Sequence, residues 1–129
     1  GQAIPAFAWT TVNWASANYD TRGMHDNIVD NSKIIIIPGE EGRYLVTASL
    51  TFPSNATADR GIRIQKNRSG NERRSLRNAN SSGYSVADVS DVFNLVAGDY
   101  LEIGAWQGTG GALSLPTDAD RNHFAVTKL

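Results

Sequence analysis

The stretch GRYLVTASLTF, residues 42–52, decides the fold class of this chain. The even-numbered residues from Tyr44 to Phe52 are apolar, whereas the positions between them are mixed. A period of two over such a length is typical of a long β-strand with one face in a core. Pro38 and Gly39 mark a turn just before it. We therefore expect a long strand that follows a tight reversal.

Strand patterns recur on both sides of this stretch, separated by turns rich in Gly, Asn and Ser. The alternation predicts a hairpin between residues 60–66 and 72–77 and a second long strand at 84–95. No segment has the spacing of an amphipathic helix. Eight to ten short strands at this spacing favour an all-β, antiparallel two-sheet sandwich or jelly roll, with residues 1–129 as a single domain. The other expected strands are 33–37, 100–106, 112–115 and 124–129.

The composition of the chain excludes several classes of protein. The 129 residues are 40% hydrophobic and 19% charged, which is not the composition of a disordered tail, a collagen stalk or a coiled coil. There is no cysteine, so disulfides, zinc–thiolate sites and thiol catalysis are excluded. The longest apolar run, Ile34 to Ile37, is too short to cross a bilayer, so no membrane insertion is expected. A net charge of −1 argues against general nucleic-acid binding.

Several short motifs, taken in order, resemble those of C1q-like and tumour-necrosis-factor-like (TNF-like) jelly-roll domains. Two further stretches resemble a branch found in bacteriophage and bacterial surface proteins. The resemblance implies a jelly roll of about ten strands that assembles as a homotrimer and binds ligands rather than catalysing a reaction. The family motifs are PGEEGRYLV at 38–46, IQKN at 64–67, LVAGDYL at 95–101 and NHFAVTKL at 122–129, and the branch motifs are YDTRGMHD at 19–26 and GGAL at 110–113.

No catalytic motif is visible in the sequence. His25 and His123 are the only histidines, and they do not have the spacing of metal ligands. Glu40 and Glu41 are adjacent, so their side chains point to opposite faces of a strand or into solvent, which is a poor arrangement for acid–base catalysis. We expect a protein that is not an enzyme and that needs no cofactor.

Calcium is the one metal for which the sequence offers candidate ligands. Asp118, Asp120 and Asn122 place hard oxygen atoms in one loop, and Asp26 and Asp30 do so in another. The alternative is that these residues cap their own turns, and the chain contains no twelve-residue calcium loop. We favour turn capping, and some relatives in the family hold calcium.

Basic residues are concentrated between Arg60 and Arg77. This stretch contains seven basic residues against one acidic residue, Glu72, whereas the rest of the chain has five basic and twelve acidic residues. One interpretation is a ridge that binds a polyanion, with Arg63, Arg73 and Arg77 as the exposed ligand-binding residues. The other is pairing between subunits, because arginine is also enriched in interfaces.

Aromatic residues supply a second candidate surface. Tyr100, Glu102 and Trp106 share one face of the strand expected at 100–106, while Leu101, Ile103 and Ala105 share the other. We assign Tyr100, Glu102 and Trp106 to a trimer interface. Exposed aromatic residues beside Arg, Asn and Asp would instead suit stacking on sugar rings.

These observations predict a trimeric, non-catalytic module at a virion surface, either a receptor-binding tip of a phage or a capsid decoration protein. Its expected partners are two further copies of the chain, other virion proteins, and a surface polysaccharide or another anionic polymer. The alternative is a secreted or cell-surface bacterial adhesion domain without a virion role. Both predictions place the protein on a virion or outside the cell.

Overall fold

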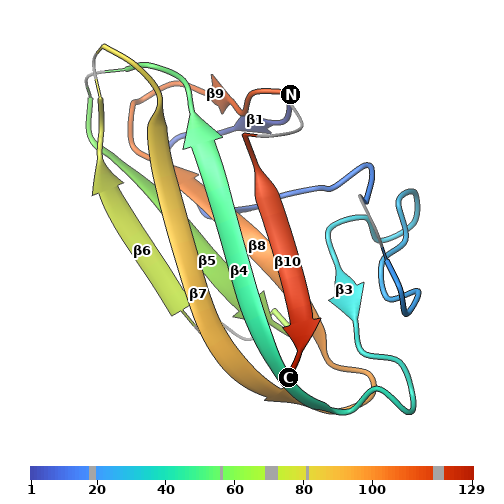
Figure 1. Cartoon of the computed structure of the whole chain (residues 1–129). Coiled ribbons are helices and arrows are strands. Elements are labelled where there is room, and N and C mark those ends of the chain that lie inside the picture. The colour runs from blue at the N-terminus through green and yellow to red at the C-terminus, as the bar shows by residue number, and fades with distance from the viewer. Residues whose placement is uncertain (18–19, 56, 69–72, 81, 118–120) are drawn as a thin grey trace.

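Two antiparallel sheets, packed face to face, make up the computed structural model (Figure 1). The structure describes residues 1–17, 20–55, 57–68, 73–80, 82–117 and 121–129. Within these ranges the regular elements are all strands, and no helix is present that could cross a membrane. The strands are β1 (Ala3–Ile4), β2 (Thr10–Thr11), β3 (Ile34–Ile35), β4 (Gly42–Phe52), β5 (Asp59–Lys66), β6 (Arg73–Asn78), β7 (Ser85–Leu95), β8 (Tyr100–Gln107), β9 (Leu113–Ser114) and β10 (His123–Lys128).

In each sheet, two long neighbouring strands form an extended antiparallel ladder. One sheet has the order β10-β4-β7, and the other has the order β2-β8-β5-β6, with β3 also paired to β8. Strands β1 and β9 form a small separate ladder at one end of the sandwich. At the open side of the sandwich, β6 and β7 are the edge strands of the two sheets, and both lie on the same side of the molecule in Figure 1.

Alternating side chains of the long strands fill the space between the sheets. The even-numbered residues from Tyr44 to Phe52 of β4 and the residues Leu101, Ile103 and Ala105 of β8 are at most 2% exposed. The period of two read from residues 42–52 is therefore the period of core packing. The buried apolar core comprises Ile4, Val12, Met24, Ile36, Tyr44, Val46, Ala48, Leu50, Phe52, Ile62, Ile64, Ala87, Val89, Leu95, Leu101, Ile103, Ala105 and Leu115.

One fully buried arginine closes an end of this core. Arg60 lies on the inward face of β5, and its guanidinium donates hydrogen bonds to the carbonyl oxygens of Thr57 at 2.8 Å and Asn55 at 3.0 Å. These bonds tie the loop before β5 to the sandwich. Arg60 is thus a structural member of the basic stretch and is not available to a ligand.

The predicted strands are present, with bounds that differ by a few residues. Two short strands, β1 and β2, were not expected from the sequence. Each has only two residues, too few for an alternation of polar and apolar residues to appear. Their pairing with β9 and β8 depends on tertiary contacts rather than on local pattern.

Candidate recognition surface

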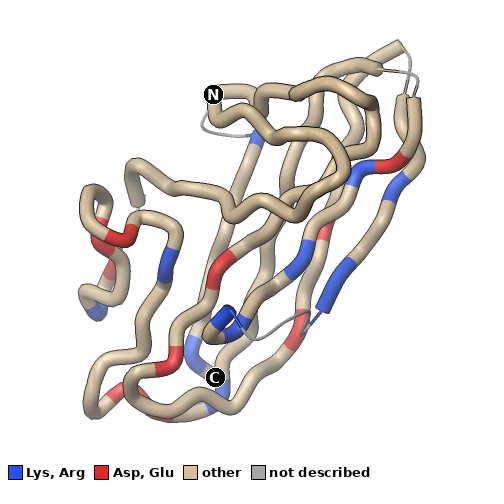
Figure 2. The backbone as a smooth tube through the Cα atoms, turned by 180° about the vertical axis from the view of Figure 1, so that it is seen from behind, with Lys and Arg blue, Asp and Glu red and all other residues tan. Residues whose placement is uncertain are grey.

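The hairpin of β5 and β6 divides the basic residues between two faces. Arg74 lies directly opposite Arg63 in the ladder, and Arg73 lies opposite the buried Ile64. Residues that face each other across a ladder point to the same side of the sheet, so Arg63 and Arg74 lie on the outer side. Figure 2 shows the basic residues gathered along the two strands at this edge.

Arg73 and Arg77 are exposed although they share the inward side of the sheet. Strand β6 is an edge strand, and its side chains remain largely exposed beside β7 instead of entering the core. Arg77 Nη2 lies 3.7 Å from Asp88 Oδ2 on β7. The sequence prediction that Arg63 lies beside Arg73 and Arg77 is wrong, because the register pairs Arg63 with Arg74.

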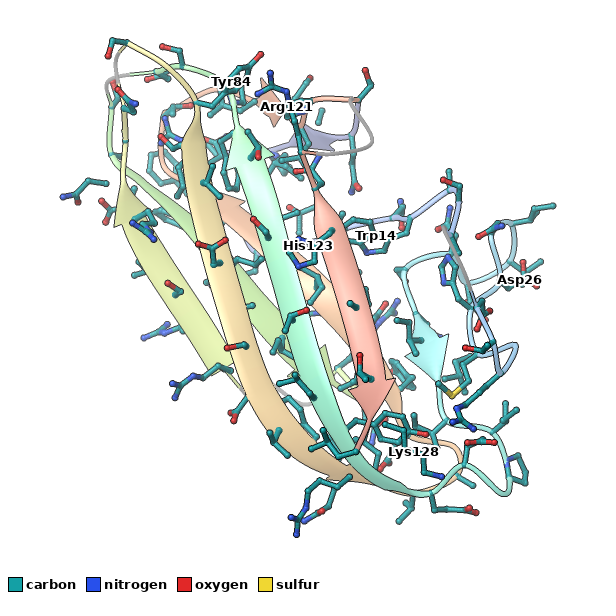
Figure 3. All side chains as sticks on the ribbon, viewed as in Figure 1. Trp14, Asp26, Tyr84, Arg121, His123 and Lys128 are labelled. Atoms are coloured by element: carbon teal, nitrogen blue, oxygen red, sulfur yellow. The ribbon has the colours of Figure 1, made fainter. Side chains whose placement is uncertain are left out.

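A polar groove of about 430 Å³ runs between β6 and the neighbouring strands of the other sheet. Arg73 contributes a cation, and the hydroxyl groups around it can donate hydrogen bonds to an oxyanion. The lining residues include Thr47, Arg73, Arg74, Ser75, Asp88, Ser90 and His123, and Figure 3 shows His123 at the start of β10.

Tyr100, Glu102 and Trp106 point away from the core, as the alternation predicts, but their environments differ. Tyr100 and Trp106 are partly exposed, whereas Glu102 is 0% exposed. The Glu102 carboxylate accepts hydrogen bonds from Ser32 Oγ at 2.5 Å, Arg68 Nε at 2.9 Å and Arg68 Nη2 at 3.1 Å. Glu102 is therefore enclosed by its own chain and does not face a neighbour.

Two opposing effects act on the Glu102 carboxylate. Burial by itself raises the pKa of Glu102, whereas the hydrogen bonds from Arg68 and Ser32 and the charges of Arg68 and Lys33 lower it. The favourable contacts outweigh burial, so the pKa of Glu102 lies below its ordinary value. The ionised form is the one that the fold stabilises.

Asn67 and Arg68, which follow the end of β5, bring the Arg68 side chain to Glu102, and we call these two residues the latch. Asn67 and Arg68 both have positive φ angles, 53° and 54°, which turn the chain back across β8. The Asn67 side chain accepts the backbone N–H of Tyr100 at 2.9 Å and donates to Asp99 Oδ1 at 2.9 Å. Hydrogen bonds from the Val96 N–H and from Asn67 lower the pKa of Asp99. The motifs at 64–67 and 95–101 thus meet in space and form a structural contact.

The outward face of β10, β4 and β7 is nearly free of charge. Among the outward side chains of these fully described strands, only Arg43 and Asp88 are charged. Leu45 lies directly opposite Val92, and the two are 37% and 48% exposed. Their neighbours across this face are mostly Ser, Thr, Ala and Val, and Figure 3 shows the face toward the viewer.

The candidate catalytic and metal-binding residues serve local roles where the structure describes them. Both ring nitrogens of His25 lie near backbone carbonyl oxygens, those of Lys33 at 2.8 Å and Trp14 at 3.0 Å. Asp26 accepts the N–H groups of Ile28 and Val29, and these hydrogen bonds lower its pKa.

The described residues contain no cluster of three or more His, Asp or Glu that could hold a metal ion. Asp30 lies 3.5 Å from Lys33 Nζ. Asn122 donates to the Pro116 carbonyl and accepts the N–H of Thr51 at 2.8 Å. Asp118 and Asp120, the other candidate calcium ligands, lie outside the described residues.

Comparison with known structures shows that the fold is a TNF-like jelly roll, as the sequence predicts. The crystal structure of murine APRIL at pH 8.5 superposes with a TM-score of 0.73 and 17% identity, covering 100% of this chain and 93% of that one. Murine APRIL at pH 5.0 gives a TM-score of 0.69 and 18% identity, covering 98% of this chain and 96% of that one. No family model and no curated protein sequence matches the chain. At this identity the likeness concerns the fold alone.

Proposed function

We propose that this protein is a non-catalytic homotrimeric recognition module that binds an anionic surface polymer. The observation that carries the proposal is the exposed basic edge, where Arg73 and Arg77 stand beside a polar groove. Arginine forms paired hydrogen bonds with phosphate and carboxylate groups, and the hydroxyl group of Ser75, on the same side of β6, supplies a further donor. Arg63 lies on the opposite face of the sheet and is therefore not part of the proposed ligand site.

The proposed assembly face is the outward face of β10, β4 and β7. Burying it would remove the exposed Leu45 and Val92 from water at little electrostatic cost, because its centre carries no charge. We propose this face, instead of Tyr100, Glu102 and Trp106, as the trimer interface, which leaves Tyr100 and Trp106 on a separate surface of the other sheet. A trimer would also present three basic edges at once, which strengthens binding to a repetitive polymer.

For the setting, we propose the surface of a virion, as a receptor-binding tip or a capsid decoration. This proposal rests on the resemblance of residues 19–26 and 110–113 to the phage and bacterial branch. A secreted or cell-surface bacterial adhesion domain would use the same fold and surfaces outside the cell, and it is the alternative.

Replacing Arg73 and Arg77 by Ser is expected to weaken binding to immobilised inorganic polyphosphate at least tenfold. Each arginine that pairs with a phosphate releases condensed counterions, so wild-type binding should also fall as salt rises, and the variant should show a shallower dependence. Surface plasmon resonance across a series of NaCl concentrations measures both quantities.

The matched control for this experiment is Arg22→Ser with Arg121→Ser, which removes the same charge outside β6 and outside the proposed assembly face. Binding by the control should stay within about twofold of wild type, and light scattering should give the same mass for all three proteins. Equal losses in both variants would reject a defined ligand site. Dissociation of the Arg73→Ser, Arg77→Ser variant into monomers would assign the two arginines to subunit pairing.

A further inference from the structure

A cluster of apolar side chains covers the outer side of the five-stranded sheet around Gly61. A Cβ atom at Gly61 would lie 2.8 Å from Leu76 Cδ2, 3.0 Å from Trp9 Cη2 and 3.3 Å from Trp106 Cβ. Likewise, a Cβ atom at Gly108 would lie 2.9 Å from Trp106 Cη2. Glycine at these two positions lets both indoles rest directly on the backbone of the sheet. We call Phe7, Trp9, Leu76 and Trp106 the aromatic platform.

The platform remains open to solvent in the chain. Phe7 is 67% exposed and Leu76 is 52% exposed, and both indoles are partly exposed. Phe7 has a φ angle of 59°, which is uncommon for a bulky residue, and its N–H donates to the Gln107 carbonyl oxygen at 2.8 Å. The Phe7 ring stands edge-on to Trp106 at a centroid distance of 6.4 Å. A strained backbone thus holds an aromatic ring in water, which is typical of binding sites.

Two arginines of like charge border the platform. The Arg63 guanidinium lies 4.6 Å from the Trp9 ring centre, and its Nε donates to Gln65 Oε1 at 2.9 Å. Arg74 lies directly across the ladder from Arg63 and forms no ion pair with any residue in the described ranges. Burial, and then the charge of Arg74, lower the pKa of Arg63. Like charges opposite each other destabilise a sheet, and a bound anion would relieve that cost.

We propose that Trp9, Trp106 and Arg74 form a binding site for an acidic sugar, a pyranose ring that carries a carboxylate. The face of an indole is electron-rich and attracts the C–H groups of a sugar ring. The Arg74 guanidinium supplies paired donors to the carboxylate. Two partly exposed indoles that rest on the sheet suit a sugar ring, whereas the apolar anchor of a protein partner usually enters a pocket. Trp9 and Trp106 lie on the opposite side of the sheet from Arg73, whereas Arg74 also borders the polar groove described above, so the two tryptophans distinguish this site from the polymer site.

Trigalacturonic acid is a suitable probe, with the carboxyl-reduced trisaccharide as the uncharged control. Two of the three tryptophans of the chain belong to the platform, so tryptophan fluorescence should report binding directly. We expect the acid to bind at least tenfold more tightly than the reduced sugar. Trp9→Ala and Arg74→Ser should each weaken acid binding at least tenfold, and Arg74→Ser should raise or preserve the melting temperature because it removes a like-charge pair.

Arg73→Ser is the matched control, since it removes the same charge one residue away on the opposite side of β6. It should leave trigalacturonate binding within twofold of wild type while weakening polyphosphate binding, and Trp9→Ala should do the reverse, so each site can fail without the other. If Trp9→Ala does not fold, Phe7→Ser tests the platform at a more exposed position. Three results would each overturn the proposal. They are an affinity of Arg74→Ser equal to that of wild type, no binding of trigalacturonic acid to folded wild type, and competition by a peptide containing Glu and Leu that binds more tightly than the acid.

Discussion

Glu102→Gln is expected to lower the free energy of unfolding by about 1–2 kcal/mol at neutral pH, because a buried acceptor loses hydrogen bonds from a charged donor that is itself largely exposed. The carboxylate is fully buried and accepts three hydrogen bonds, two of them from the Arg68 guanidinium. An amide of the same shape has one oxygen and cannot accept from all of these donors. Urea denaturation at a fixed protein concentration measures the loss. If Glu102→Gln has the same free energy of unfolding as wild type, the contact between Glu102 and the latch does not contribute to stability.

The same variant should also remove part of the acid sensitivity of the fold. The pKa of Glu102 is lower in the folded chain than its ordinary value of 4.5, so its ionisation adds stability that is fully present above about that pH. This contribution is lost as pH falls through the folded pKa. Between pH 5 and pH 3, the unfolding free energy of Glu102→Gln should therefore change less than that of wild type.

Glu40→Gln is the control for this pair of measurements. Glu40 lies near the surface and contacts Arg22 at 2.8 Å and Lys128 at 3.5 Å. Because exposed ion pairs contribute little, this variant should lose less than about 1 kcal/mol. A similar loss in both variants would mean that burial of Glu102 is not the source of its effect.

The environment of Glu102 also shows how far sequence reasoning extends. Alternation predicts that Glu102 points away from Leu101 and Ile103, and it does. The side chains that enclose Glu102 come from Ser32 and Arg68, which lie 70 and 34 residues away in the sequence. Nothing in a local pattern indicates which loops fold over a strand, so a buried carboxylate was predicted to face a neighbour.

The register of the β5–β6 hairpin is the second feature that the local sequence does not determine. Residues 69–72 lie outside the described part of the chain, and the pairing of Arg63 with Arg74 depends on how many residues the turn uses. A shift of one position moves every side chain to the other face. The charge of the stretch and the shared face of Arg73 and Arg77 were predicted, whereas the edge position of β6 and the pairing of Arg63 with Arg74 were not. The aromatic platform was missed because Gly61 brings Trp9, Leu76 and Trp106 together only in three dimensions.

Leu45→Asp is expected to convert the proposed trimer into monomers. Wild type should scatter light as about three times 13.9 kDa at micromolar concentration, and the variant should give a mass near 13.9 kDa. Leu45 lies opposite Val92 at the centre of the uncharged face, so a trimer of the variant would bury three carboxylates without partners. Such burial costs several kcal/mol per charge, which exceeds what one exposed leucine contributes to folding.

Two comparisons separate this effect from simple destabilisation or a wrong interface. Ile28→Asp introduces the same charge at an 87% exposed aliphatic residue away from the sheets, and it should remain a trimer. A variant at Leu45 that unfolds at the same urea concentration as monomeric wild type, obtained by dilution, would show that only assembly is affected. A wild-type chain that is monomeric at micromolar concentration would refute trimer formation. If Leu45→Asp stays trimeric while Tyr100→Asp dissociates, the subunits meet through the five-stranded sheet, and the uncharged face of β10, β4 and β7 remains free for another partner.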